Sequence, residues 1–171
     1  MDTSGWHDFY VMAGGAAAAL TGLVVVALSL HAKAIMAHPL YRDRAFAAIV
    51  ALVTQVFLAA AVLVPAQSSL ALALEVGLVA VFWFARSIWA VPYIRTNAGR
   101  LRGRAYEYRR PASHWALEWT VWIVWVLALI GSSAELIVGS ATGLYLLAFA
   151  MVLMFGSQVW SVWVLIAEVT E

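Results

Sequence analysis

Seven polar or aromatic residues lie inside long apolar stretches of this sequence, where they could bind a ligand or line a path for one. They are Gln55, Glu75, Arg86, Glu118, Trp122, Trp125 and Gln158. A charged side chain within a membrane costs at least about 2.5–3.5 kcal/mol on insertion scales, so such residues usually face protein or water. Carboxylates, amides and an arginine in such places can line or gate an ion path. We predict that the two glutamines hydrogen-bond across helix interfaces or line a narrow aqueous path.

Helical spacing places the charged residues on two faces. Glu75 and Arg86 are separated by only about 20° around a helix but by about 16 Å along its axis, too far for a direct pair. A second face consists of Glu118, Trp122, Trp125, Leu129 and Ser132. Glu75 lies near a turn and is simplest to interpret as a rim carboxylate that reaches interfacial water. Arg86 and Glu118 approach the same leaflet, so we predict an ion pair between them across neighbouring helices.

The composition is that of a membrane protein. Of 171 residues, 65% are hydrophobic and 11% charged, against about 45–50% apolar and about 25% charged in soluble domains. This excludes a globular nucleic-acid binder, a secreted disulfide scaffold and most soluble enzymes. The absence of cysteine excludes disulfides and thiolate zinc sites. The histidines lack metal-site spacing, and no nucleophile motif occurs, so we predict no metal, no cofactor and no enzymatic activity.

Five apolar segments predict an all-α integral membrane bundle of five transmembrane helices in a single domain, residues 1–171. The segments cover residues 9–32, 45–64, 70–94, 115–137 and 143–166. Each is long enough to cross a hydrocarbon core of about 30 Å, and a chain in lipid must satisfy its own backbone hydrogen bonds. Nine of the ten Lys and Arg residues lie in two loops, 33–44 and 95–114. The positive-inside rule therefore predicts the N-terminus outside and the C-terminus inside.

The tryptophans are concentrated in the central-to-inner half of this topology. Eight of the nine lie there: Trp83, Trp89, Trp115, Trp119, Trp122, Trp125, Trp160 and Trp163. Trp89, Trp115, Trp119 and Trp163 fit an aromatic belt at the inner interface. The deeper group, Trp83, Trp122, Trp125 and Trp160, either fills the bundle core or walls a cavity for a flat apolar ligand or a lipid tail.

Two further features predict partners. Gly14, Ala18 and Gly22 form a ridge of small residues four apart, which allows close helix packing either within the protomer or between subunits. In the 95–114 loop, anionic lipid headgroups are the predicted partners of Arg100, Arg102, Arg104, Arg109 and Arg110. The same loop could dock a cytoplasmic protein. Because the loop lies beside the membrane, we expect no nucleic-acid partner.

The number of spans, the length and the many tryptophans resemble in composition the tryptophan-rich sensory protein/translocator (TSPO) family, which binds tetrapyrroles and sterol-like ligands. The first loop, 33–44, has a single Pro39 where that family has a proline- and tryptophan-rich loop, so no site residue is carried over. The stretch 9–23, with the sequence FYVMAGGAAAALTGL, resembles the opening of small bacterial polytopic membrane proteins. That resemblance implies a bacterial origin and no particular activity.

Three functions follow from these features. The leading hypothesis is a homo-oligomeric ion channel or small transport protein, assembled through the small-residue ridge and lined by the intramembrane polar residues. The second is a binder of a hydrophobic ligand or lipid in a Trp-lined inner-leaflet pocket capped by Arg86. The third is an accessory subunit of a larger membrane complex. The expected location is the bacterial cytoplasmic (inner) membrane, with membrane lipids, further copies of the chain and other membrane subunits as partners.

Overall fold

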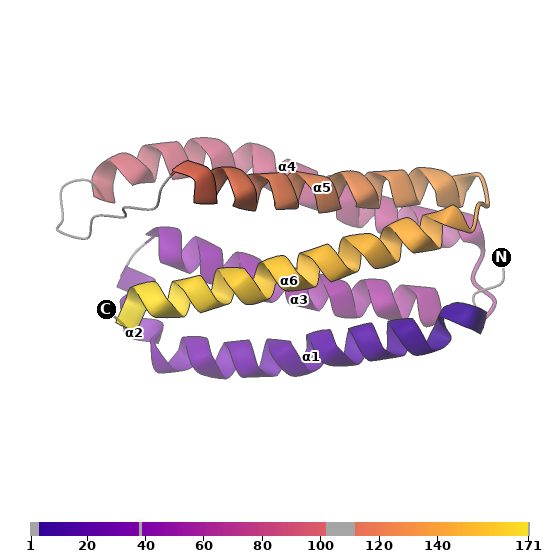
Figure 1. The fold of residues 1–171 in the computed structure, drawn as a ribbon, viewed down its shortest axis with the longest axis horizontal. Coiled ribbons are helices and arrows are strands. Elements are labelled where there is room, and N and C mark those ends of the chain that lie inside the picture. The colour runs from indigo at the N-terminus through magenta and orange to yellow at the C-terminus, as the bar shows by residue number, and fades with distance from the viewer. Residues whose placement is uncertain (1–3, 38, 102–111, 171) are drawn as a thin grey trace.

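The computed structural model describes residues 4–37, 39–101 and 112–170, and the side chains of residues 5–37, 39–90 and 117–167. All regular structure in this part of the chain is helical (Figure 1). A short 3-10 turn, η1 (Ser4–Trp6), precedes α1 (His7–Leu30), α2 (Ala32–Ala37), α3 (Pro39–Leu63), α4 (Ser69–Leu101), α5 (Ala112–Ile137) and α6 (Thr142–Thr170). Five helices, α1 and α3 to α6, are long and apolar enough to cross a membrane. The predicted all-α class is therefore confirmed.

The long helices run side by side as a bundle with two different ends (Figure 1). At one end, which we name the turn end, the short connections 64–68 and 138–141 join α3 to α4 and α5 to α6. At the other, which we name the α2 end, α2 connects α1 to α3. The N-terminus lies at the turn end and the C-terminus at the α2 end. Helix α1 packs mainly on α3, α4 packs on α5, and α6 contacts both α5 and α3.

Several helices extend beyond the predicted spans. Helix α3 begins at Pro39 rather than at residue 45, because proline suits the first helical position, where its fixed φ is helical and its missing N–H is not needed. Helix α4 continues to Leu101 and α5 begins at Ala112, which shortens the predicted 95–114 loop. Of the predicted headgroup-binding residues, Arg102, Arg104, Arg109 and Arg110 lie outside the described residues, as does the side chain of Arg100.

Small residues bring the helices close together at the turn end. Gly143 on α6 packs directly on α5, so that a Cβ added there would lie 2.7 Å from Cγ of Leu136. Two serine hydroxyls of α5 add hydrogen bonds to the neighbouring helices. Ser132 Oγ donates to the carbonyl oxygen of Gly143 on α6 (2.8 Å), and Ser133 Oγ donates to that of Ala73 on α4 (2.8 Å). These bonds satisfy hydroxyl groups that would otherwise be costly to leave unpaired in an apolar region.

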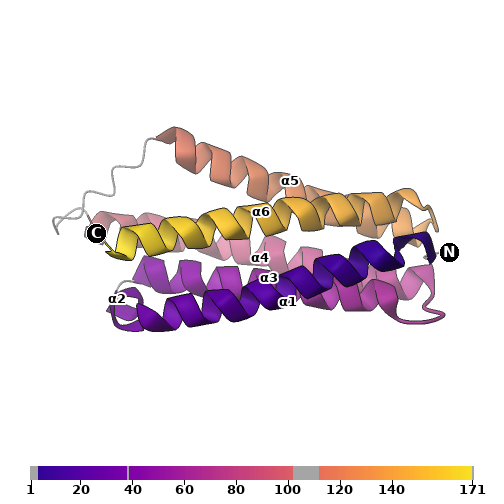
Figure 2. The same ribbon diagram turned by 60° about the horizontal axis from the view of Figure 1, so that its bottom comes forward.

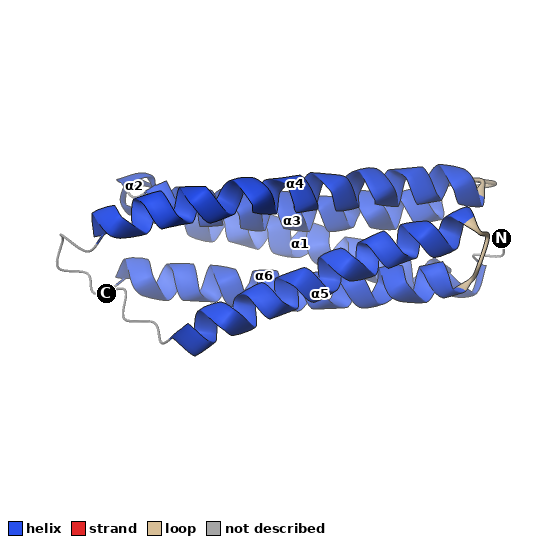
Figure 3. Ribbon diagram, turned by 90° about the horizontal axis from the view of Figure 1, so that it is seen from above, coloured by secondary structure: helices blue, strands red, loops and turns tan. Residues whose placement is uncertain are grey.

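Bulky residues separate the helices at the α2 end. Trp119 and Trp122 on α5 and Trp160 on α6 lie in this half of the bundle. Helix α5 diverges from α6 and α4 towards this end (Figures 2 and 3). The segment 102–111 between α4 and α5 is also longer than either connection at the turn end. The bundle is therefore narrow where small residues and short turns hold it and wide where the tryptophans lie.

A continuous apolar core fills the narrow part. Trp125 and Leu129 of α5 and Met154 of α6 are buried, together with leucines of α3, α5 and α6. The polar-aromatic face of α5 points into the bundle at this level, since Trp125, Leu129 and Ser132 are fully buried. The Tyr10 hydroxyl connects α1 to α6 by donating to the Leu144 carbonyl oxygen (3.0 Å).

The three small residues predicted to form a ridge on α1 do not all face the same way, so packing within the protomer explains only part of the ridge. Gly14 faces α3, where an added Cβ would lie 2.8 Å from Cβ of Ala59, so this glycine permits close packing within the protomer. Ala18 and Gly22 are exposed, and a Cβ at Gly22 would meet nothing within 4 Å. Packing within the protomer therefore accounts for one residue of the ridge, and the other two face away from the bundle.

This division gives a matched pair of variants. We expect Gly14→Val to lower the free energy of unfolding by about 1–3 kcal/mol, the usual cost of overpacking, because Ala59 on α3 would have to move. Gly22→Val makes the same change in helix propensity at an open position, so it should change the free energy of unfolding little. Thermal or denaturant unfolding in detergent measures both. Equal losses for the two variants would contradict a close α1–α3 contact at Gly14.

Candidate binding cavity

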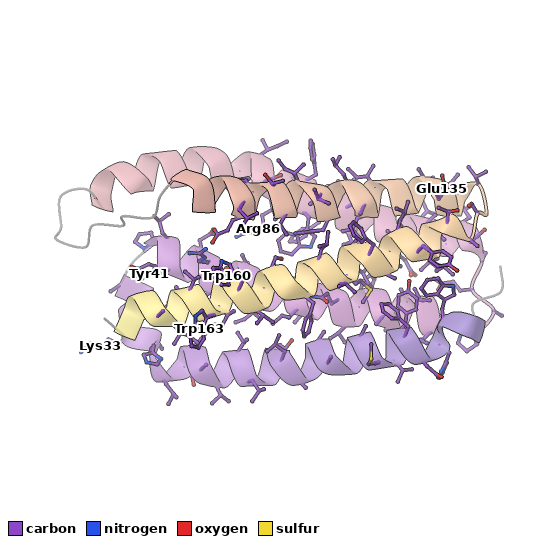
Figure 4. All side chains as sticks on the ribbon, viewed as in Figure 1. Lys33, Tyr41, Arg86, Glu135, Trp160 and Trp163 are labelled. Atoms are coloured by element: carbon purple, nitrogen blue, oxygen red, sulfur yellow. The ribbon has the colours of Figure 1, made fainter. Side chains whose placement is uncertain are left out.

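The diverging helices leave an open cavity of about 620 Å³ at the α2 end, within the range of about 300–1,000 Å³ typical of ligand sites. Its walls come from α3, α4, α5 and α6. Most of the wall is apolar and includes Leu40, Trp83, Leu117, Val121, Trp122 and Trp160. The polar part includes Asp43, Arg44, Arg86, Glu118, Gln158 and Ser161. Figure 4 shows Tyr41, Arg86 and Trp160 towards this end of the bundle, with Glu135 at the other.

Arg44 joins three helices at the cavity. Its Nη2 donates to both carboxylate oxygens of Glu118 on α5, at 2.8 and 2.9 Å. Its Nε donates to Oγ of Ser161 on α6 at 3.0 Å. The Arg44 and Glu118 side chains are only 17% and 24% exposed, so the pair is largely shielded from solvent. Charge-assisted bonds of this kind are about twice as strong as neutral ones.

Arg86 forms the second ion pair, with Asp43. Its Nη2 donates to Oδ1 and Oδ2 of Asp43, at 3.0 and 3.1 Å, and to the Asp43 carbonyl oxygen at 3.5 Å. The two side chains are 22% and 31% exposed. The pair connects α4 to α3.

The predicted Arg86–Glu118 ion pair is therefore wrong, although both residues line the same cavity. The reason is the early start of α3, which brings Asp43 and Arg44 into the bundle between α4 and α5. Consecutive helical residues point about 100° apart. Asp43 can therefore reach α4 while Arg44 reaches α5 and α6, and each predicted partner is taken by the nearer opposite charge.

A chain of edge-to-face tryptophans forms one wall of the cavity and continues into the core. The ring centroids of Trp119 and Trp122 lie 5.7 Å apart, those of Trp122 and Trp125 5.8 Å, and those of Trp125 and Trp83 5.4 Å. Such pairs contribute about 0.5–1.5 kcal/mol each beyond the area that they bury. Trp119, Trp122 and Trp83 line the cavity, and Trp125 is fully buried behind them. The deeper tryptophans therefore divide between the core, which Trp125 fills, and a cavity wall, which Trp83 and Trp122 line.

The outer tryptophans differ from this group. Trp89 and Trp163 are 78% and 67% exposed and lie towards the α2 end, which suits an interfacial belt. Trp160 is also exposed but contributes to the cavity wall. The side chain of Trp115 lies outside the described residues.

The seven predicted site residues lie in three different places in the structure. Arg86, Glu118, Trp122 and Gln158 line the cavity, with Trp125 directly behind it. Glu75 lies towards the turn end, where its Oε2 accepts a hydrogen bond from Gln67 Nε2 (2.9 Å). Gln55 is buried in the core, and its Nε2 has no partner among the described residues.

Of the two uses predicted for the glutamines, hydrogen bonding across a helix interface is not found for either amide nitrogen among the described residues. Gln158 Nε2 donates to Oγ of Ser157, the preceding residue of the same helix, at 3.3 Å. Gln55 Nε2 donates to no described residue.

The sequence prediction does not include three of the residues that form the ion pairs and hydrogen bonds at the cavity, namely Asp43, Arg44 and Ser161. It places Arg44 in the first loop, among the basic residues that set the orientation. The signal that could have placed it correctly is Pro39, a helix-start residue five positions before. No protein-family model, curated protein or solved structure matches this chain. The functional argument for this chain therefore depends on the geometry of the cavity.

A double-mutant cycle tests the assignment of partners. We expect Arg44→Gln and Glu118→Gln to show a coupling energy of about 2 kcal/mol, below the about 3–5 kcal/mol lost when a fully buried pair is broken, because both side chains are partly exposed. For Arg86→Gln and Glu118→Gln we expect a coupling below about 0.5 kcal/mol. Unfolding in detergent measures all five variants. A larger coupling for Arg86 with Glu118 would contradict the observed pairing.

Proposed function

We propose that this polytopic membrane protein binds a hydrophobic or amphiphilic molecule in the cavity between α3, α4, α5 and α6. The observation that carries the proposal is a ligand-sized cavity whose wall is mainly apolar and whose charged groups are already paired. Apolar walls with a few fixed polar groups are typical of small-molecule sites. Of the functions considered from the sequence, ligand binding in a Trp-lined pocket fits this arrangement best.

The cavity is closed towards the turn end, which favours binding over conduction. In the described part of the chain its wall extends no further than Trp83 on α4, Trp122 on α5 and Gly156 on α6. Beyond these residues, Trp125, Leu129 and Met154 are buried in the apolar core. Glu75 and Gln55, which a path along the protomer would need, are separated from the cavity by that core. A molecule entering at the α2 end would therefore stop there.

The cavity suits a molecule with a polar end. Its charged residues lie in the half of the bundle towards the α2 end, since Arg86 is eight residues from the end of the apolar segment 70–94 and Glu118 is the fourth residue of segment 115–137. At 1.5 Å per residue, Arg86 is about 12 Å inside the span. The deeper wall is formed by Trp83 and Trp122. A ligand would place its polar group towards the α2 end and its apolar part against the indole rings.

We propose that this site lies in the inner leaflet of a bacterial cytoplasmic membrane. The proposal is supported by the two basic loops at the α2 end, which the positive-inside rule assigns to the cytoplasm. Channel or transport activity, self-association through the exposed Ala18 and Gly22, and a role as a subunit of a larger complex remain predictions. Anionic lipids and neighbouring membrane proteins are the partners expected at the basic loops.

Filling the cavity tests the proposal. Gly156 lines it, and a Cβ there would meet no atom within 4 Å, so Gly156→Leu should occupy the space without a clash. The probe is a long-chain alcohol brominated along its chain, because bromine quenches tryptophan on contact. We expect saturable quenching of the wild-type protein, and an apparent affinity at least about tenfold lower for Gly156→Leu, the loss that about 1.4 kcal/mol produces.

Gly22→Leu is the matched control. Position 22 is equally open but lies on α1, no described residue of which lines the cavity. This variant should bind the brominated alcohol as the wild type does, and both variants should keep the wild-type unfolding temperature. Identical quenching of the wild type and Gly156→Leu would mean that the probe sits elsewhere and would refute the proposed site.

A further inference from the structure

Arg86 has hydrogen-bond donors that the protein does not use. All three of its bonds to Asp43 are made by Nη2. Among the described residues, its Nε and Nη1 have no hydrogen-bond partner, and neither is among the buried atoms that lack one, so both retain contact with open space. Arg86 lines the cavity. A ligand acceptor that reaches these N–H groups would form charge-assisted hydrogen bonds with them, which are about twice as strong as neutral ones.

The acceptors beside Arg86 are already engaged. Both oxygens of Asp43 accept from Arg86, and both oxygens of Glu118 accept from Arg44. The formal charges of these four side chains cancel. A cationic headgroup would have to compete with an arginine for its carboxylate. A headgroup that only accepts hydrogen bonds can instead bind the free N–H groups of Arg86 while both ion pairs persist.

The size of the cavity limits the rest of the ligand. A water molecule, which has one non-hydrogen atom, takes up about 30 Å³. A cavity of about 620 Å³ therefore holds on the order of twenty non-hydrogen atoms. That is the size of one long hydrocarbon chain with a small headgroup, and less than a two-chain phospholipid.

We propose that the ligand is a single-chain amphiphile with an oxyanion headgroup, a carboxylate or a phosphate monoester, and that Arg86 binds this headgroup through Nε and Nη1. This inference rests on the proposed function and specifies the ligand class for the same cavity. Arg86 acts as the headgroup-binding residue, and Asp43 holds its guanidinium in place through Nη2. The hydrocarbon chain lies against Trp83, Trp119 and Trp122.

The test compares four brominated probes that share one chain and differ only in the headgroup: carboxylate, phosphate monoester, alcohol and trimethylammonium. Quenching is measured with the wild-type protein in uncharged detergent at neutral pH. We expect one or both oxyanion probes to bind about tenfold or more tightly than the alcohol, as one hydrogen bond to a charged group predicts, and the trimethylammonium probe to bind most weakly. The stronger of the two oxyanion probes identifies the headgroup.

Two variants separate headgroup binding from a structural role of the ion pair. Arg86→Gln removes the donors and should lower the affinity for the oxyanion probe about tenfold. Asp43→Asn keeps an acceptor for Arg86 but removes the nearby negative charge, so it should raise that affinity several-fold. The affinity for the alcohol should change less than about twofold in both. A purely structural ion pair would instead shift the two variants in the same direction.

The outcomes distinguish this inference from the function on which it depends. Equal affinity of the wild type for all four probes would leave the cavity as a binding site and overturn the oxyanion assignment. The absence of saturable quenching by any probe would refute the proposed function itself. If Arg86→Gln does not fold, as judged by helicity and unfolding temperature, the four probes with the wild type and with Asp43→Asn still test whether the cavity prefers an oxyanion headgroup.

Discussion

The arrangement of the α2 end depends on two adjacent and opposite charges of α3, Asp43 and Arg44. Isolated charges are expensive in a low-dielectric region, and removal of either partner leaves the other uncompensated. Asp43 pairs with Arg86 on α4, and Arg44 pairs with Glu118 on α5 while also bonding Ser161 on α6. One turn of a single helix thus fixes the positions of the three other helices that surround the cavity.

The cavity exists because small residues draw the helices together at the turn end, whereas indole rings and ion pairs keep them apart at the α2 end. Towards the turn end, Gly143 and two serines let α5 approach its neighbours within direct contact. Towards the α2 end, indole rings and paired charges occupy the space between the same helices and prevent a similar approach. Apolar side chains can close a gap by sliding into it, whereas a bidentate ion pair holds its helices at the length of two side chains. The space left between these restraints is the site.

The sequence predicted what depends on local composition and helical period. Five spans follow from hydropathy, and the common face of Trp125, Leu129 and Ser132 follows from their spacing on α5. The partner of Arg86 could not be derived in this way, because it depends on which residue of another helix lies opposite. That in turn depended on the start of α3: placing it at residue 45 rather than at Pro39 left Asp43 and Arg44 in a loop. Gln55 and Gln158 show the same limit, since polarity predicts a need for partners but not their presence.

The narrow turn end has a mechanical consequence for the cavity. Helix α5 has 26 residues and is therefore about 39 Å long. Helix α5 packs closely on α6 near Gly143 and diverges from its neighbours at the other extremity, so a change in its tilt would pivot about the contact near Gly143. A tilt of about 5° about that point moves the opposite extremity by about 3 Å. The breadth of the cavity mouth is thus governed by packing almost a full membrane thickness away.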